Sequence, residues 1–142
     1  MKRHEALAPL SREHHEALIL AQLLKKGVPA YKGLPTDTAG KISYARQLYA
    51  DKLRRHFLDE EKILEIVKGK NHLIDTISRE IFNEHSILRK LFDSIDTAGV
   101  DSLDELAVIL EQHIRKEERI LFPLIQQHCD EDLLKKVTAV FG

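Results

Sequence analysis

The sequence predicts an all-α protein: an up-down-up-down four-helix bundle with a short extra C-terminal helix. Apolar residues recur with the period of an α-helix in four long segments, and the glycines and prolines gather between these segments. No segment shows the strict apolar and polar alternation of a β-strand. Because the connection between the second and third segments is short, we expect their helices to be antiparallel neighbours.

Helix boundaries follow from capping residues and breakers. Ser11 can cap the first helix, which stops at Gly27, and residues 28–40 contain two prolines and two glycines that predict a long loop. We expect the second helix to run from about residue 41 to residue 67. Asn71 can then cap a third helix that continues to about residue 95.

The last part of the chain contains a fourth helix and a short fifth one. Ser102 followed by Glu105 is a capping-box pattern, which predicts that the fourth helix opens there. Pro123 lacks an N–H for the preceding turn, so we expect it to kink or end this helix. Asp130 can cap a final helix over residues 131–140.

Composition limits the class of protein. A chain of 142 residues, 43% apolar and 32% charged, fits one globular domain over residues 1–142. The net charge of −1 without a basic run argues against a nucleic-acid partner, and no apolar stretch approaches the roughly 18 residues of a membrane span. A single cysteine, Cys129, and no apolar segment after the basic N-terminus favour a reducing, cytoplasmic location.

Histidine and glutamate recur in a fixed pattern. The pattern H-x-x-x-E-E occurs in the second helix at residues 56–61 and in the fourth at residues 113–118. The first and third helices each carry a Glu-His pair, at residues 13–14 and 84–85. The two halves of the chain therefore carry the same series of motifs, a Glu-His pair followed by H-x-x-x-E-E, which is the pattern of a degenerate internal duplication.

Helical geometry predicts that these side chains face inward. Residues four apart lie on one helix face, so a histidine and a glutamate at that spacing can reach one centre. His56 and Glu60 share the apolar stripe of Ala45, Leu53, Ile63 and Val67, and His113 and Glu117 share that of Leu106, Ile109, Ile120 and Leu124.

The two histidines of the Glu-His pairs also lie on the apolar stripes of their helices. His85 lies on the stripe of Ile74, Ile81, Leu88 and Phe92, and His14 lies with Leu10, Ala17, Leu18 and Ala21. The neighbouring His15 points about 100° further around the helix. We therefore expect His14 to be the inward residue, although a rotated first helix would exchange the two.

Inward-facing carboxylates need a counter-charge. A buried, uncompensated glutamate is costly, and bound divalent or trivalent cations would supply the missing charge. Imidazole nitrogens and carboxylate oxygens suit iron, manganese or zinc. The predicted metal ligands are His14, His56, Glu60, His85, His113 and Glu117. The alternative is structural: buried histidines bonded to glutamates in a metal-free bundle that serves interactions.

These residues resemble the hemerythrin-like, or HHE cation-binding, family over nearly the whole chain, from Leu10 to about Gln126. The resemblance rests on the two Glu-His pairs, on the two H-x-x-x-E-E motifs and on the Glu-Glu-Arg-Ile-Leu-Phe-Pro stretch at 117–123. It implies a four-helix bundle with two iron ions in a non-haem diiron centre. The glutamates of the two motifs would bridge the metals, and the four histidines would be terminal ligands.

One departure bears on function. Oxygen-carrying members of the family have a second histidine one turn from the first on the third helix, but Ile81 and Arg89 stand four residues either side of His85 here. One iron would then lose a ligand or take water or another carboxylate, with Glu61, Glu84 and Glu118 as candidates. An open iron favours reactivity or exchange over reversible oxygen carriage. Ferritin-like bundles, the alternative diiron scaffold, carry Glu-x-x-His motifs on two helices. This alternative is excluded, because no histidine here follows a glutamate by three residues.

The expected function is therefore metal binding, with a small diatomic ligand or peroxide as the partner. Oxygen, peroxide, nitric oxide or iron itself could be bound or sensed, and a diiron peroxidase or oxidase is the enzymatic alternative. Ile19 and Leu23 lie on a second face of the first helix, which could support a homodimer or receive the long loop.

Overall fold

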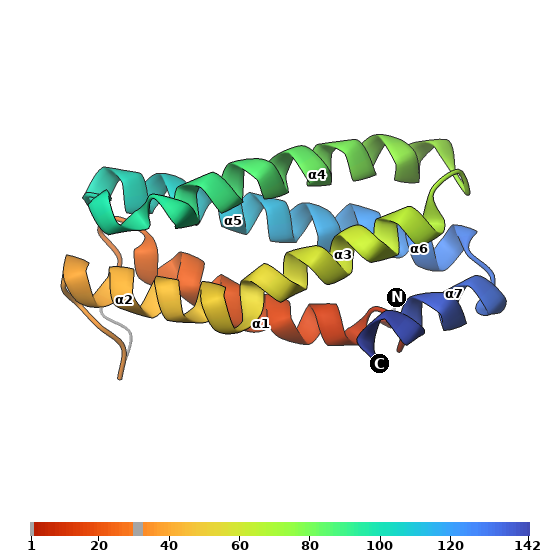
Figure 1. The fold of residues 1–142 in the computed structure, drawn as a ribbon, viewed down its shortest axis with the longest axis horizontal. Coiled ribbons are helices and arrows are strands. Elements are labelled where there is room, and N and C mark those ends of the chain that lie inside the picture. The colour runs from red at the N-terminus through yellow and green to blue at the C-terminus, as the bar shows by residue number, and fades with distance from the viewer. Residues whose placement is uncertain (1, 30–32) are drawn as a thin grey trace.

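The computed structural model describes residues 2–29 and 33–142, and these residues form helices and loops without a β-strand (Figure 1). The protein is therefore all-α, as predicted. The elements are α1 (Ala8–Leu24), α2 (Thr38–Leu48), α3 (Arg54–Val67), α4 (His72–Asp93), α5 (Val100–Lys116), α6 (Phe122–His128) and α7 (Glu131–Thr138), with π-helical turns η1 (Tyr49–Leu53) and η3 (Glu117–Leu121) and 3₁₀ turns η2 (Ile95–Thr97) and η4 (Ala139–Phe141).

Long helical rods lie lengthwise beside one another (Figure 1). They are α1, the continuous stretch from α2 through η1 to α3, α4, and the stretch from α5 through η3 to α6. α1 packs mainly along α5, α4 packs against α5 and α3, and α7 folds back onto α3. α1 contacts α3 much less than it contacts α5, and a groove lies between α1 and α3.

Several predicted helix ends are confirmed by capping contacts. Asn71 accepts hydrogen bonds from the backbone N–H groups of Leu73 and Ile74, and Asp130 accepts one from Leu133. After α3, Gly69 has a φ of 83°, the left-handed conformation that favours glycine where a helix stops.

Two predicted helix starts are wrong. α1 begins at Ala8 with a proline in its first turn, where a missing N–H does no harm, and Ser11 lies inside the helix with its hydroxyl bonded to Glu118. α5 begins at Val100, so the residue expected to open it, Ser102, is already helical and makes no capping bond. The second rod also starts earlier than predicted, at Thr38, because Asp37 accepts a bond from Gly40.

Pro123 does not end the fourth rod, which continues to His128, but the helix departs from α-helical geometry directly before it. The π turn η3 precedes it, and the N–H of Phe122 bonds to the carbonyl of Glu117, five residues back. The carbonyl of Glu118 therefore receives no N–H from Phe122 and none from the proline. The guanidinium of Arg3 donates to that carbonyl instead, at 2.9 Å.

The apolar core consists of two clusters, one on each side of the histidine and glutamate layer. In α1, for example, Leu10 precedes His14 and belongs to one cluster, while Leu20 follows it and belongs to the other. Leu23 is 4% exposed and lies in this second cluster, so the face of α1 that was considered for a homodimer is partly used by the core.

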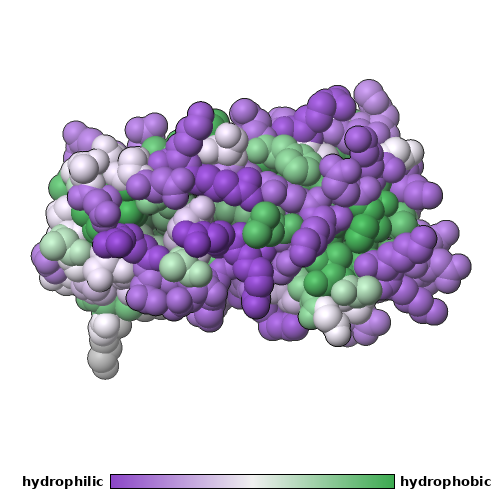
Figure 2. Space-filling view, viewed as in Figure 1, coloured by the Kyte–Doolittle hydropathy of each residue, from purple (hydrophilic) through white to green (hydrophobic). Residues whose placement is uncertain are grey.

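Polar side chains cover most of the face shown in Figure 2, and apolar side chains appear there as separate patches. No helix in the described ranges combines the length and apolar composition that crossing a membrane requires.

Candidate metal centre

The six residues predicted as metal ligands are brought together at the level where the two apolar clusters meet. Each is at most 2% exposed: His14, His56, Glu60, His85, His113 and Glu117. They come from α1, α3, α4, α5 and the first residue of η3. His15 is exposed, so the inward residue of this pair is His14. Whether these side chains bind metal remains a prediction, but their positions agree with it.

The six side chains form two overlapping groups that share Glu60 and Glu117. One group adds His14 and His56 to the shared glutamates, and the other adds His85 and His113. Within each group the four ligand atoms lie within 4.8 Å of one another, so each group could hold a metal ion. The two groups lie side by side and have both carboxylates in common.

All four histidines turn Nε2 toward the shared glutamates. The predicted four-residue spacing places Nε2 of His56 3.0 Å from Glu60 and Nε2 of His113 3.0 Å from Glu117. Nε2 of His85 lies 3.0 Å from Glu60, and Nε2 of His14 lies 3.2 Å from both glutamates.

Each histidine also has a carboxylate at its other ring nitrogen, Nδ1, and this outer carboxylate always comes from a neighbouring rod. The pairs are His14 with Glu118 at 2.6 Å, His56 with Glu13 at 2.9 Å, His85 with Glu61 at 2.8 Å, and His113 with Glu84 at 2.8 Å. Every rod therefore supplies one outer carboxylate to the histidine of another rod, and the four pairs close a ring around the centre.

This ring corrects one expectation. Glu61, Glu84 and Glu118 were candidates for an additional metal ligand, but each is bonded to a histidine Nδ1 instead. A carboxylate that accepts the Nδ1–H fixes the imidazole tautomer and leaves Nε2 free for a metal. The sequence contained a signal for these residues, because each stands directly beside a predicted ligand. Its meaning depends on the neighbouring rod, which the sequence does not show.

Three of the outer carboxylates are themselves hydrogen-bonded to cations. Arg89 donates two bonds of 2.9 Å to Glu61, Lys116 bonds Glu84, and Arg3 donates to Glu118 at 3.1 Å. Ser11 adds a further bond to Glu118 at 2.8 Å. The fourth carboxylate, Glu13, has no such bond among the described residues: its ion pair with Arg55 spans 3.9 Å, which is too long for a hydrogen bond.

The contacts within the metal-free centre favour protonated histidines and an ionised Glu60. Burial alone would raise the pKa of Glu60, but the charge of His56 and the contacts of the other histidines hold this pKa well below its usual range. Burial would lower the pKa of His56, yet Glu60 and Glu13 raise it to about 9. The same opposition raises the pKa of His14, His85 and His113. A metal ion must therefore displace protons from these rings.

Several polar atoms at the centre converge without bonding one another. Nε2 of His113 and both carboxylate oxygens of Glu117 are buried and have no hydrogen-bond partner in the described part of the chain. Nε2 of His113 lies only 3.0 Å from Glu117, so the missing bond reflects direction and not distance. Buried polar groups are almost always paired, and atoms aimed at a common point without pairing fit metal ligands.

The π turn η3 changes which residues face the centre. Ile120 was predicted to share the inward stripe of His113 and Glu117, but it is 45% exposed, whereas Leu121 is 1% exposed. A π turn inserts one extra residue, which shifts the inward face by one position after Glu117. The prediction for Ile120 is therefore wrong because it assumed an uninterrupted α-helix.

Apolar residues enclose the centre. Phe122 stacks against the ring of His14 and Phe57 stacks against that of His85, with ring centres 5.6 and 4.5 Å apart. A narrow space beside Glu60 and Glu117, too small for a water molecule, is lined otherwise by Leu10, Ile63, Leu64, Leu121, Phe122 and Ile125.

In comparisons with protein-family models, with curated proteins and with solved structures, nothing matches this chain. The geometry of the six inward side chains therefore carries the functional argument on its own.

Proposed function

We propose that the protein is an up-down-up-down four-helix bundle that binds two iron ions between its helices, in the manner of hemerythrin-like proteins. Glu60 and Glu117 would be shared by both ions, and each ion would take two histidines. The first position would use His14 and His56 and the second His85 and His113. Manganese or zinc would fit the same donor set.

The observation that carries this proposal is the pair of four-residue groups, in which Nε2 of His14 and of His85 bonds Glu60 while inner atoms of His113 and Glu117 have no partner among the described residues. A structural role for buried histidine and glutamate would direct each polar atom to a hydrogen-bond partner, as happens at Nδ1 of all four histidines. At the inner side, His113 and Glu117 leave three buried atoms unpaired. A cation between the glutamates would satisfy them and would neutralise two buried carboxylates.

We propose that the ligand bound at the centre is a small diatomic molecule or peroxide. Two histidines and two shared glutamates leave each ion below six ligands, so coordination positions remain for a small molecule. The apolar space beside Glu60 and Glu117 is narrow, so even a diatomic ligand would require its lining to move slightly, whereas an organic substrate would require far larger movements. This restriction favours binding or sensing over a peroxidase or oxidase that acts on larger substrates.

The test is metal content and its dependence on the shared glutamates. Protein expressed with iron and purified without added metal should contain about two irons per chain by elemental analysis. Glu117→Gln removes a shared charge and should reduce the content to one iron or none. Glu105→Gln, an exposed residue of α5, is the matched control and should leave the content unchanged. Wild-type protein that binds no iron, manganese or zinc would support the metal-free bundle instead.

Ligand binding is tested on the iron-loaded protein. Nitric oxide added to the ferrous protein without oxygen should change the visible absorption and the electron paramagnetic resonance signal, and the change should saturate with added ligand. An iron-loaded protein that responds to neither nitric oxide nor peroxide would leave metal binding intact and refute the ligand proposal.

A further inference from the structure

The four histidine arms of the centre are not equivalent. An arm is defined here as a histidine, its outer carboxylate and the cation beside that carboxylate. In the arms of His14, His85 and His113 the cation is hydrogen-bonded to the carboxylate and less than a third exposed. In the arm of His56 the cation is Arg55, which is 73% exposed and lies 3.9 Å from Glu13. The His56 arm is therefore held least firmly.

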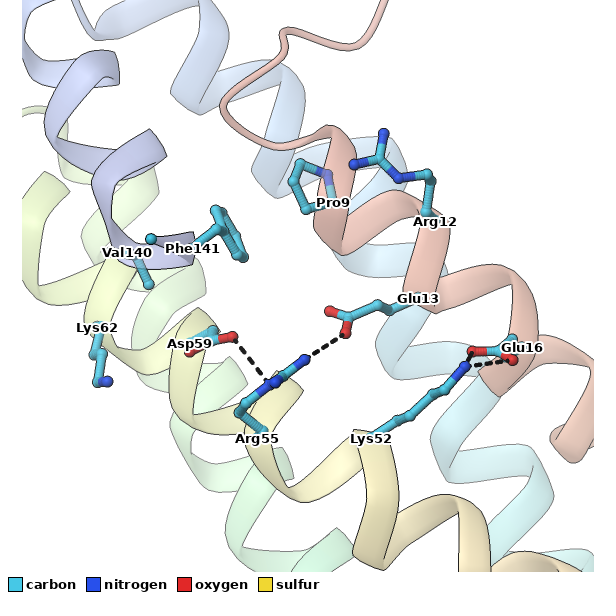
Figure 3. Close-up of a pocket in the computed structure, with 11 residues that line it drawn as sticks. Pro9, Arg12, Glu13, Glu16, Lys52, Arg55, Asp59, Lys62, Val140 and Phe141 are labelled. Carbon is cyan, nitrogen blue, oxygen red and sulfur yellow. Dashed lines mark hydrogen bonds and ion pairs between the residues drawn. The ribbon is translucent and has the colours of Figure 1, made fainter.

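The His56 arm also borders the largest of the grooves described. This groove, of about 790 Å³, lies between α1 and α3 below the C-terminal turn η4, and Glu13 and Arg55 line it (Figure 3). Glu13 is the residue that bonds Nδ1 of His56, so one side chain separates the groove from a predicted metal ligand. The grooves next in size are lined by none of the four outer carboxylates.

A second carboxylate, Asp59, points into the groove opposite Glu13 (Figure 3). Asp59 is only 8% exposed and makes no hydrogen bond among the described residues. Its nearest cation is Arg55, whose Nε lies 4.0 Å away, while another nitrogen of the same guanidinium lies 3.9 Å from Glu13. The guanidinium thus occupies the space between two carboxylates without bonding either.

We propose that metal ions reach the centre through this groove, with Glu13 and Asp59 as the first binding point, and that the position at His14 and His56 exchanges faster than the position at His85 and His113. A divalent cation takes the place of Arg55, whose exposed side chain is free to swing into solvent. It then passes to Nε2 of His56. This inference rests on the proposed function and specifies how the same centre is loaded.

The order of loading follows from how each arm is held. Release of a metal ion from His85 or His113 requires movement of a ring whose outer carboxylate is fixed by Arg89 or Lys116. On its outer side, movement of His56 disturbs a bond to Glu13, a carboxylate that no cation hydrogen-bonds among the described residues. Outer partners of metal-bound histidines affect metal affinity by about 10- to 100-fold when they are changed. A difference of that size between two positions is large enough to separate their release rates.

The experiment uses Co²⁺ as the probe, because its visible absorption reports coordination. Full-length protein is loaded with two equivalents of Co²⁺, mixed with excess chelator, and followed by stopped-flow absorption. We expect two phases of equal amplitude. Glu13→Gln should accelerate the fast phase about tenfold and leave the slow phase unchanged. Glu84→Gln makes the same chemical change at the outer carboxylate of His113 and should accelerate the slow phase.

Loading is measured in the opposite direction, by adding Co²⁺ to metal-free protein. Asp59→Asn should slow uptake several-fold, because the first binding point loses a charge. Arg55→Gln should accelerate uptake, whereas Arg115→Gln, which alters an exposed arginine paired with Glu111, should not. Circular dichroism and the melting temperature of each variant show that it is folded.

The outcomes separate this inference from the proposed function. Three results would refute entry of metal through the groove without contradicting the proposed metal centre. They are release of two bound Co²⁺ ions in a single phase, a slow phase that responds to Glu13→Gln, and uptake that is unchanged in Asp59→Asn. Wild-type protein that takes up no Co²⁺ would refute both.

Discussion

The metal-free protein should lose stability as the pH rises from 6.5 to 9, and His56 is the residue that shows this best. Its pKa is raised from 6.5 to about 9, because Glu60 and Glu13 favour the protonated ring more than burial disfavours it. A raised pKa means that the folded state binds the proton more tightly than the unfolded state does. The resulting stabilisation is complete below pH 6.5 and disappears as the pH passes 9.

The size of the effect follows from the two pKa values. A change from 6.5 to about 9 corresponds to about 3 kcal/mol for His56. The other three buried histidines shift in the same direction and add to the loss. A loss of 3 kcal/mol is a substantial part of the roughly 5–15 kcal/mol that stabilises a typical domain.

Urea denaturation at pH 6.5, 8 and 9.5 measures this loss. The free energy of unfolding of metal-free protein should fall by several kcal/mol, and the loss should be smaller in His56→Gln. His15→Gln should keep the wild-type profile, because this neighbouring histidine is exposed. In Zn²⁺-loaded protein the stability should not fall over this range, since the rings are already deprotonated. A metal-free protein of constant stability from pH 6.5 to 9.5 would contradict the account of the charged centre.

Three further outcomes are expected. Removal of bound Zn²⁺ with a chelator at pH 7.5 should lower the melting temperature, because a ligand at 100 times its Kd stabilises a protein by about 2.7 kcal/mol; an unchanged melting curve would argue for a metal-free bundle. Phe57→Ala should cost about 3–5 kcal/mol in urea denaturation, since this ring is 1% exposed and packs against His85. Asn71→Ala should cost about 1 kcal/mol by loss of the cap of α4 while metal content stays at the wild-type value, which distinguishes a remote stability effect from a change at the centre.

The positions of the inward side chains could be predicted from the sequence because they depend on short-range geometry. His56 and Glu60, like His113 and Glu117, are four residues apart, and this spacing alone places each pair on one helix face. The caps of α4 and α7 were predictable for the same reason, since Asn71 and Asp130 bond backbone groups two or three residues away.

What could not be predicted depends on contacts between rods or on departures from α-helical geometry. The bond from His56 to Glu13 needs the relative height of two rods, which no local pattern contains. The exposure of Ile120 depends on the π turn η3, and a rule based on 100° per residue assumes that such turns are absent. The starts of α1 and α5 were placed too late because polar residues that can cap, such as Ser11, can also bond elsewhere.

Arg3 has a practical consequence for anyone preparing this protein. Through its contacts with the carbonyl and the carboxylate of Glu118, the segment ahead of α1 is connected to His14 in two steps. A purification tag fused to the amino terminus, or removal of the first few residues by a protease, would disturb these contacts and so the position of His14. Batches that differ only in that tail should then differ in how much metal they retain.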